Sequence, residues 1–261
     1  MRTNWVREKV RAGQATLGCF MGLGSPNVAE LLAHVGFDWL VIETEHNGLD
    51  SAEIQQMLMA MNGTDAIPIV RVPSSNHVFI QRALDMGALG IVVPLVKSVE
   101  EAQAIVRATR YPPQGTRSFG PLRASHYKLD NEDYFARAND NILVILILET
   151  KEMVDDLEAI AAVPGIDVLY LGPMDLALSL GVNPMQPPLP KVDAVIERML
   201  EVGHYGGAAM GMGVSTPDDL RKRMAQGFTF LGYGPDYFML IDAAQAGLAA
   251  FQQQPAMSVG R

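Results

Sequence analysis

Residues 142–149 read Ile142-Leu143-Val144-Ile145-Leu146-Ile147-Leu148-Glu149, a run of seven apolar residues that stops at a carboxylate. A run that is apolar at every position is typical of a strand buried on both faces, as in parallel sheets covered by helices. A second run, Val168-Leu169-Tyr170-Leu171, leads through Gly172-Pro173-Met174 to Asp175 in the same way. The two runs predict neighbouring parallel strands in an α/β protein.

Short apolar segments of the same kind recur along the whole chain. Together they give about eight candidate strands, at residues 15–21, 37–42, 67–72, 89–94, 142–148, 167–171, 207–212 and 228–232. Amphipathic segments of helical length lie between most of them, at residues 51–61, 76–86, 98–109, 150–161 and 216–226. Alternating strands and helices indicate parallel pairing. About eight such units in this length favour a (β/α)8 TIM barrel over a doubly wound sheet, and no G-x-G-x-x-G follows a candidate strand.

The apolar segments continue without a polar or Pro/Gly-rich linker that would separate two domains. The chain has 261 residues, of which 49% are hydrophobic. We therefore expect one barrel domain over residues 1–251, followed by a flexible tail at residues 252–261. Two segments, 111–140 and 183–190, interrupt the rhythm of short loops, and long loops in compact domains are often functional.

Charge and cysteine content narrow the classes of function. The chain has 20 Lys and Arg against 29 Asp and Glu, a formal net charge of -9, which offers no general basic surface for nucleic acid or an anionic membrane. Cys19 is the single cysteine, so no intrachain disulfide can form. The first ten residues have no apolar signal core, and no run reaches membrane-spanning length. These features favour a cytoplasmic protein that acts on small molecules.

Polar groups gather where the predicted strands end. The carboxyl ends of parallel strands in a barrel meet at one mouth, and this is where chemistry is done. The residues expected there are Glu43, Glu45, His46, Arg71, Glu149 and Asp175. Glu149 and Asp175 are 175 - 149 = 26 residues apart, the length of one βα unit, so they should stand on adjacent strands. Two carboxylates favour a hard divalent cation such as Mg²⁺ or Mn²⁺; the alternative is a pair of helix-capping or solvated loop acids.

Arg71 and His46 suggest what the mouth could do. Arg71 lies in Pro68-Ile69-Val70-Arg71-Val72-Pro73, an apolar setting where a permanent charge needs an anion. That anion is either a structural carboxylate, Glu43 or Glu45, or the developing oxyanion of a substrate. His46 follows two acids and is either a general acid or base or a loop residue without chemistry.

These groups suit a 2-oxo acid substrate. A cation held by Glu149 and Asp175 would chelate the carboxylate and keto oxygen of the acid, while Arg71 stabilises the enolate. Backbone N–H groups around Gly172, Met174 and Asp175, at the start of a predicted helix, could bind the substrate carboxylate.

The chain resembles the HpcH/HpaI aldolase/citrate lyase family over nearly its whole length. The resemblance rests on Gly36-Phe37-Asp38-Trp39-Leu40-Val41-Ile42 before Glu45-His46, on Arg71-Val72-Pro73, on residues 106–115, on Glu149-Thr150-Lys151-Glu152 and on Gly172-Pro173-Met174-Asp175-Leu176. It is most similar to the metal-dependent class II pyruvate aldolases of that family, which form or cleave 4-hydroxy-2-oxo acids.

The resemblance implies roles for single residues. Glu149 and Asp175 would ligate Mg²⁺, Mn²⁺ or Co²⁺, Arg71 would stabilise the enolate, and His46 would move protons with Asp85 as its orienting partner. It also implies a TIM barrel, a homo-oligomer that is hexameric or trimer-based, exchange of the last helix between neighbours, and an aldehyde site completed by another subunit.

Four features differ from the usual family pattern or extend it. The family commonly has Asp-Gly-Glu-His where this chain has Glu43-Thr44-Glu45-His46, and glutamine where it has Ile147. The segment 115–127 carries Arg117 and Arg123, which could bind a distal carboxylate or phosphate of the substrate or form ion pairs between subunits. Met212, at the end of a predicted strand, is expected to line the aldehyde pocket.

Three other activities stay open from sequence. Lys97 follows a predicted strand and would be the nucleophile of a Schiff-base aldolase. A CoA-ester lyase of the citrate-lyase type would share the metal carboxylates, although the acidic balance offers few basic residues for nucleotide phosphates. A non-catalytic protein that binds 2-oxo acids would have the same donors without turnover.

Overall fold

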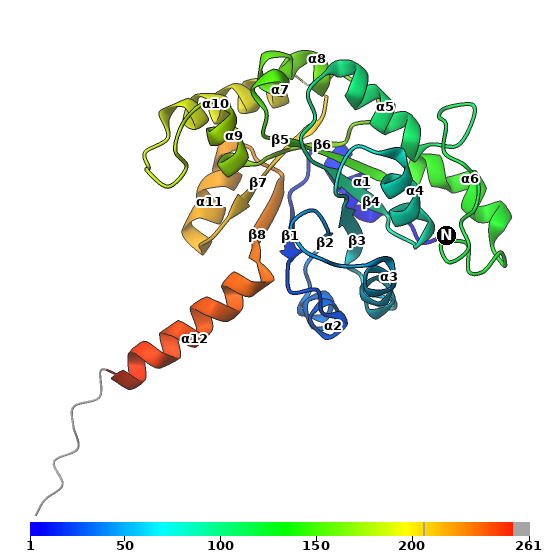
Figure 1. Cartoon of the computed structure of the whole chain (residues 1–261), viewed down its shortest axis with the longest axis horizontal. Helices are drawn as coiled ribbons and strands as arrows, with labels where there is room; N and C mark the ends of the chain where they lie inside the picture. Colours follow the sequence, from blue (N-terminus) through cyan, green and yellow to red (C-terminus); the bar gives the residue numbers. More distant parts are fainter. Residues whose placement is uncertain (206, 253–261) are drawn as a thin grey trace, which may run out of the picture.

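Eight parallel strands close into a barrel in which each strand pairs with the next in sequence and β8 pairs with β1. The computed structural model describes residues 1–205 and 207–252. The predicted (β/α)8 TIM barrel is thereby confirmed (Figure 1). The strands are β1 (Thr16–Met21), β2 (Trp39–Glu43), β3 (Ile67–Arg71), β4 (Gly90–Val93), β5 (Leu143–Leu148), β6 (Val168–Leu171), β7 (Ala209–Val214) and β8 (Phe230–Pro235).

Helices surround the barrel and connect successive strands (Figure 1). They are α1 (Trp5–Arg11), α2 (Pro26–Val35), α3 (Ser51–Ala60), α4 (His77–Asp85), α5 (Val99–Thr109), α6 (Asn131–Asn141), α7 (Lys151–Asp155), α8 (Leu157–Ala161), α9 (Pro173–Ser179), α10 (Pro190–His204), α11 (Pro217–Gln226) and α12 (Asp236–Gln252).

Three segments differ from their predicted form. The helix expected over residues 150–161 is divided into α7 and α8 at Asp156, and the long segment 111–140 contains most of α6. Gln252, the first residue of the predicted tail, ends α12 instead. The rest of that tail, residues 253–261, lies outside the described residues.

Side-chain caps explain where several helices begin. The hydroxyl of Thr216 accepts the N–H of Asp219 at the start of α11, and Pro217 occupies the first helical position, where no N–H is needed. Asp50 and Glu53 form a complete capping box at α3. At α5 a capping box is only half formed: the Ser98 hydroxyl accepts the N–H of Glu101, but the Glu101 carboxylate accepts the N–H of Lys97 rather than that of Ser98.

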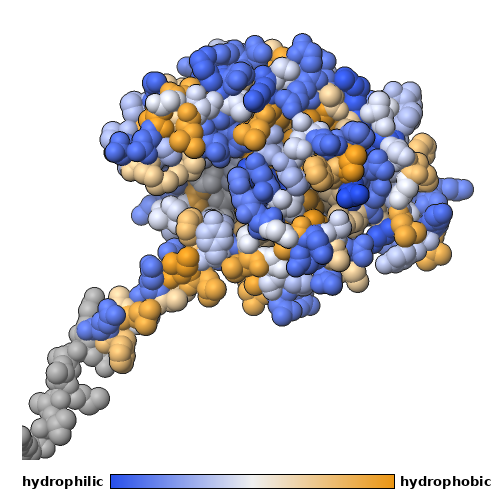
Figure 2. All heavy atoms as spheres, in the orientation of Figure 1, coloured by the Kyte–Doolittle hydropathy of each residue, from blue (hydrophilic) through white to orange (hydrophobic). Residues whose placement is uncertain are grey.

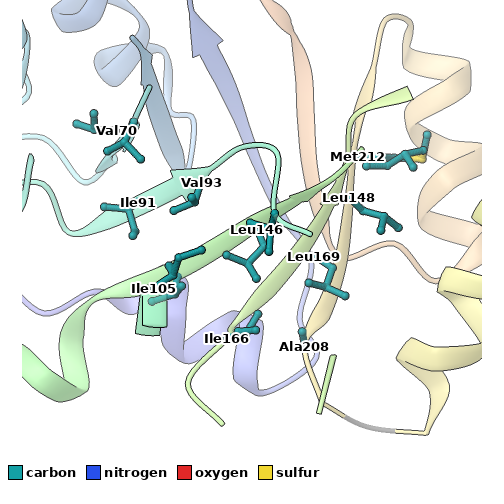
Figure 3. Packing of buried hydrophobic residues seen from close by; sticks show 14 of the residues in the cluster. Val70, Ile91, Val93, Ile105, Leu146, Leu148, Ile166, Leu169, Ala208 and Met212 are labelled. Carbon is teal, nitrogen blue, oxygen red and sulfur yellow. The ribbon is translucent and has the colours of Figure 1, made fainter. Parts of the chain in front are cut away.

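The apolar core has two layers, which explains why the strands are apolar at successive positions. One layer lies between the strands and the helices; Leu146 and Leu148 of β5 belong to it, together with Ile105 of α5 (Figure 3). The other fills the lumen of the barrel and includes Ile145 and Ile147 of the same strand. Alternate residues of β5 therefore face opposite sides, and both sides are buried.

Aromatic rings and glycines fill the lumen together. Trp39 stacks on Phe230 with ring centroids 4.1 Å apart and an interplanar angle of 5°. Gly18 on β1 leaves room for this stack, because a Cβ atom there would lie 2.0 Å from the Trp39 ring. The lumen below the mouth is a packed core, as in other TIM barrels, and it supports the side chains above it.

The last helix does not pack along the barrel. α12 projects away from it, and its apolar side chains are visible along its length (Figures 1 and 2). Asp236 is its one buried residue among those the structure describes. Its exposed large apolar residues are Tyr237, Phe238, Leu240, Ile241, Leu248 and Phe251. Among the described residues, no helix is both long enough and apolar enough to cross a membrane.

Candidate active site

Glu43 and Arg71 are the last residues of β2 and β3 and stand opposite each other in the register. Along both strands, alternate residues such as Val41 and Ile69 belong to the lumen layer. Because side chains alternate along a strand, Glu43 and Arg71 continue that inward series at the carboxyl end of the barrel.

Arg71 is surrounded by carboxylates. Its Nη1 atom lies 3.0 Å from Oε2 of Glu43, and its Nη2 atom contacts Glu45 and lies 3.8 Å from Oε2 of Glu149. The Arg71 side chain is 11% exposed, and its buried Nε atom has no hydrogen-bond partner within the described part of the chain. The guanidinium is thus fixed at the mouth, with a donor still free.

Glu43 organises the loop that follows β2. Its Oε1 atom accepts the backbone N–H groups of Glu45 at 2.7 Å and His46 at 3.2 Å, while its Oε2 atom binds Arg71. The Thr44 hydroxyl donates to the Arg71 carbonyl oxygen. Of the two partners predicted for Arg71, a structural carboxylate is therefore present in the structure.

His46 lies at the mouth, but Asp85 does not lie beside it. Nε2 of His46 is 3.6 Å from Oε2 of Glu45, and the ring is 62% exposed. Asp85 ends α4, next to the turn that enters β4 at the amino-terminal end of the barrel. A helix of nine residues spans roughly 13 Å, so the two side chains of one subunit lie near opposite ends of the barrel.

Two buried tyrosines hold Arg117, which in turn holds Asp85. The guanidinium carbon of Arg117 lies 4.6 Å from the centre of the Tyr111 ring and 5.7 Å from that of Tyr134. Its Nη2 atom donates to Oδ1 of Asp85 at 2.7 Å. Arg123 donates to the Met86 carbonyl oxygen and to Asn62. Both arginines thus bind groups of their own chain, away from the mouth.

Glu149 is almost completely buried, with 2% of its side chain exposed. Its Oε1 atom accepts the N–H of Leu95 at 2.7 Å; Leu95 is held at φ 56°, a left-handed conformation. Burial raises the pKa of Glu149 to about 7. The Leu95 N–H and Arg71 oppose that rise, whereas Glu45 and Asp175 reinforce it. The ionised form of Glu149 is therefore disfavoured unless a cation stabilises its negative charge.

Asp175 lies in the first turn of α9, after Gly172 and Pro173. The N–H of Gly172 bonds to the Leu148 carbonyl oxygen at 3.0 Å, so it is already used by the sheet. Pro173 has no N–H, which leaves the N–H groups of Met174 and Asp175 at the start of this helix. The N–H of Gly172 is therefore not left free for a substrate, and what Gly172 adds is space: a Cβ atom there would lie 2.7 Å from Oε2 of Glu149.

The donor set fits a divalent cation. Four carboxylates, those of Glu43, Glu45, Glu149 and Asp175, interact electrostatically at the mouth with Arg71 as the opposing charge. Burial raises the pKa of Glu45, and the neighbouring carboxylates add to the rise. Within residues 1–205 and 207–252, no three His, Cys, Asp or Glu side chains surround one point. A site of two carboxylates completed by substrate and water suits Mg²⁺, Mn²⁺ or Co²⁺.

One residue of β7 lies elsewhere than predicted, and one residue of β6 was not predicted to be near the site. Met212 is buried in the layer between strands and helices, near Leu148 (Figure 3), which does not support its predicted place in an aldehyde pocket. The inward positions of β7 are Gly211 and Gly213. On β6, sequence reasoning missed Tyr170, which faces the lumen; counting alternate residues back from Gly172 would have found it.

A parallel eight-stranded barrel with carboxylates and an arginine at the carboxyl ends of its strands has the architecture of a TIM-barrel enzyme, in which that end of the barrel holds the active site. The model of the HpcH/HpaI aldolase/citrate lyase family matches residues 16–243. The chain belongs to this family.

Named relatives cover almost the whole chain. It is 36% identical to a hydroxypyruvate/pyruvate aldolase of Roseovarius nubinhibens, over 96% of this chain and 97% of that protein. It is 35% identical to a 5-keto-4-deoxy-D-glucarate aldolase of Shigella dysenteriae, over 93% and 94%. The crystal structure of an HpcH/HpaI family protein from Burkholderia cenocepacia superposes with a TM-score of 0.91 at 33% identity, covering 96% of this chain and all of that one.

Proposed function

We propose that this chain is a divalent-metal-dependent aldolase that forms or cleaves 4-hydroxy-2-oxo acids through the enolate of pyruvate or hydroxypyruvate. The observation that carries the proposal is the carboxylate cluster around Arg71, with Glu149 at its buried edge. The names of the relatives support the reaction type, carbon–carbon bond cleavage or formation.

Each residue at the mouth has a separate task in this proposal. Glu149 and Asp175 hold the cation, which when bound would act as a Lewis acid on the 2-oxo acid. Arg71 stabilises negative charge on the keto oxygen as it develops, because its position is fixed by Glu43 before substrate arrives. The N–H groups of Met174 and Asp175 face the substrate carboxylate. His46 takes up and returns protons, with Glu45 at 3.6 Å from its Nε2 atom.

The enzyme is proposed to be a homo-oligomer, hexameric or built from trimers. The apolar surface of the projecting helix α12 supports this, because monomers rarely expose so much contiguous apolar surface. Exchange of α12 between neighbours would bury it. A second subunit could also bring its Asp85 to His46 as the predicted orienting partner, since the Asp85 of the same chain is too distant. The single, buried Cys19 supports a cytoplasmic location.

Structural features favour this reaction over two of its three rivals, the Schiff-base aldolase and the CoA-ester lyase. Lys97 is exposed, so it lacks the buried, apolar surroundings in which the amine of a Schiff-base lysine is activated. The two arginines of the segment 115–127 bind their own chain and leave no basic cluster there for the phosphates of CoA. A non-catalytic protein that binds 2-oxo acids would show no turnover.

Proton exchange tests the proposal. Pyruvate in D₂O with Mn²⁺ should exchange its methyl protons in the presence of the enzyme, as followed by NMR. We expect Glu149→Gln to abolish exchange and Arg71→Ala to slow it at least about 100-fold, as loss of a transition-state donor does. Glu152→Gln, an exposed glutamate on α7, is the matched control. Full exchange after exhaustive chelation would refute the metal-dependent mechanism, and borohydride trapping on Lys97 would then establish the Schiff-base route.

A further inference from the structure

Tyr170 is an inward residue of β6 whose ring is fixed by aromatic neighbours. Its ring centroid lies 5.3 Å from that of Phe20 and 6.2 Å from that of Phe230. The residue is 7% exposed. In the sheet register it stands beside Ile147 on β5 and Gly211 on β7. The ring therefore has little rotational freedom, and its hydroxyl has a fixed position.

Glycines on β7 and β8 make room for that hydroxyl. A Cβ atom at Gly232 would lie 2.5 Å from the hydroxyl oxygen, and one at Gly213 would lie 3.5 Å from it. These two glycines are themselves paired in the register. Gly213 is exposed although its neighbours Met212 and Val214 are buried. The hydroxyl thus lies beside a part of the lumen that opens to solvent.

The Tyr170 hydroxyl has no hydrogen-bond partner among residues 1–205 and 207–252. It is not among the fully buried polar atoms that lack a partner, so part of the hydroxyl oxygen is accessible to solvent. A tyrosine hydroxyl in a buried setting normally has a partner. Burial raises the pKa of Tyr170, while Arg71 acts in the opposite direction, so the phenol stays protonated near the guanidinium of the site. It is a neutral donor that lacks an acceptor.

The surroundings of the hydroxyl restrict what that acceptor can be. Phe20, Ile147 and the paired glycines offer no polar side chain, so the phenol is a single hydrogen-bonding group on an apolar floor. In the proposed function, the carboxylate and keto oxygen of the donor 2-oxo acid are already bound at the cation, Arg71 and the start of α9. The remaining part of a three-carbon donor is C3.

We propose that Tyr170 is a specificity-determining residue whose hydroxyl hydrogen-bonds a hydroxyl group on C3 of the donor, so that the site favours a 3-hydroxy-2-oxo acid over an unsubstituted one. This inference rests on the proposed function, because it takes the donor to be a 2-oxo acid held by the cation and Arg71. Ile147, which pairs with Tyr170 in the register, is apolar and leaves the phenol as the polar group of this layer.

The test compares two donors in one assay that needs no aldehyde. Exchange of C3 protons in D₂O is measured with hydroxypyruvate and with pyruvate on the Mn²⁺-loaded enzyme. Loss of a neutral hydrogen bond costs about 0.5–1.5 kcal/mol, which is roughly 2- to 13-fold. Tyr170→Phe should lower kcat/KM for hydroxypyruvate by that factor, mainly through KM, and leave the value for pyruvate within about twofold.

Two further variants separate binding from structure. Tyr111→Phe removes another buried phenol hydroxyl, which lies beside Arg117 and away from the mouth. It should leave kcat/KM unchanged for both donors. Gly213→Ala places a methyl group in van der Waals contact with the Tyr170 hydroxyl. It should lower kcat/KM for hydroxypyruvate more than kcat/KM for pyruvate. Equal losses for both donors in Tyr170→Phe, or no loss for either, would overturn the inference. Absence of exchange in the wild-type enzyme with both donors would instead refute the proposed function on which it rests.

Discussion

Gly172 shows how one missing side chain shapes the site. A Cβ atom at this position would lie 2.7 Å from Oε2 of Glu149 and 2.8 Å from Cγ2 of Ile147. Contacts this short are not tolerated without movement, and the Glu149 carboxylate, as the end of a flexible side chain, is the group expected to shift. The glycine is therefore required for the orientation of the carboxylate proposed to bind the metal.

Gly172→Ala should weaken metal binding more than it weakens the fold. We expect the Mn²⁺ dissociation constant from calorimetric titration to rise at least about 10-fold, as when the support of a metal ligand is lost. Unfolding free energy should fall by about 1–3 kcal/mol from overpacking. Gly48→Ala, at an exposed glycine with no atom within 4 Å of the added Cβ, is the control. Unchanged Mn²⁺ affinity in Gly172→Ala would contradict the interpretation.

The raised pKa of Glu149 predicts how metal and pH act together. Without metal, the folded state binds the Glu149 proton more tightly than the unfolded chain does, because burial raises the pKa from 4.5 to about 7. This contribution to stability is present below pH 4.5 and is lost as the pH rises through about 7. A bound cation needs the ionised carboxylate.

The increase in Tm on adding Mn²⁺ should therefore be larger at pH 8 than at pH 5.5, as measured by calorimetry. In Glu149→Gln the increase should be small at both pH values, because the variant cannot ionise at this position. An equal increase in the wild-type protein at the two pH values would show that Glu149 does not govern metal binding.

At the scale of elements, Asp236 joins the first turn of α12 to the loop after β1. Its carboxylate accepts the N–H groups of Gly22 at 2.8 Å and Leu23 at 3.2 Å, as well as the N–H of Tyr237 at 2.9 Å. Asp236 is 5% exposed, whereas the other described residues of α12 are exposed, apart from the half-buried Met239. This carboxylate therefore ties the start of the helix to the loop after β1.

Asp236→Ala should lower the unfolding free energy by about 1–2 kcal/mol, because it removes the acceptor of two part-buried backbone N–H groups. Hydrogen exchange should accelerate at residues 22 and 23 if these bonds hold the loop. Asp242→Ala, on the exposed surface of the same helix, should change neither quantity. Wild-type exchange rates at both residues in Asp236→Ala would rule out this role.

In the part of the chain that the structure describes, α12 is a helix whose apolar residues are largely left exposed. Leu240 and Leu248 of α12 are 62% and 60% exposed. If α12 packs against a second copy, as proposed, charges at these positions cannot be buried without a large loss of free energy. The assembly should then separate.

The double variant Leu240→Glu with Leu248→Glu should therefore have a smaller molar mass than the wild-type protein in light scattering after size exclusion. Gln245→Glu adds a charge at an exposed polar position of the same helix and is the control. Retention of the wild-type mass in the double variant would show that this surface of α12 is not the interface.

Sequence reasoning placed the strands well because burial on both faces leaves a strong local pattern. All eight predicted segments overlap observed strands, and Glu43, Arg71 and Glu149 lie at or just after strand ends as expected. The sequence did not predict the capping box at Asp50. It did not predict helix α6 either, because this helix has a polar sequence and its position depends on the packing of Tyr134 and Ala138 against the loop. The pairing of Arg117 with Asp85 could not be predicted, since 32 residues separate them.

The barrel and the groups at its mouth can be predicted from the sequence alone, because the alternation of apolar strands and amphipathic helices is a local property. Which way each side chain faces, and which groups meet, depends on the tertiary structure. It turned Met212 away from the lumen and Tyr170 into it, bound Glu43 to Arg71, and separated Asp85 from His46 by the length of a helix. Register, shear and packing set these outcomes, and they arise from contacts between residues far apart in the chain.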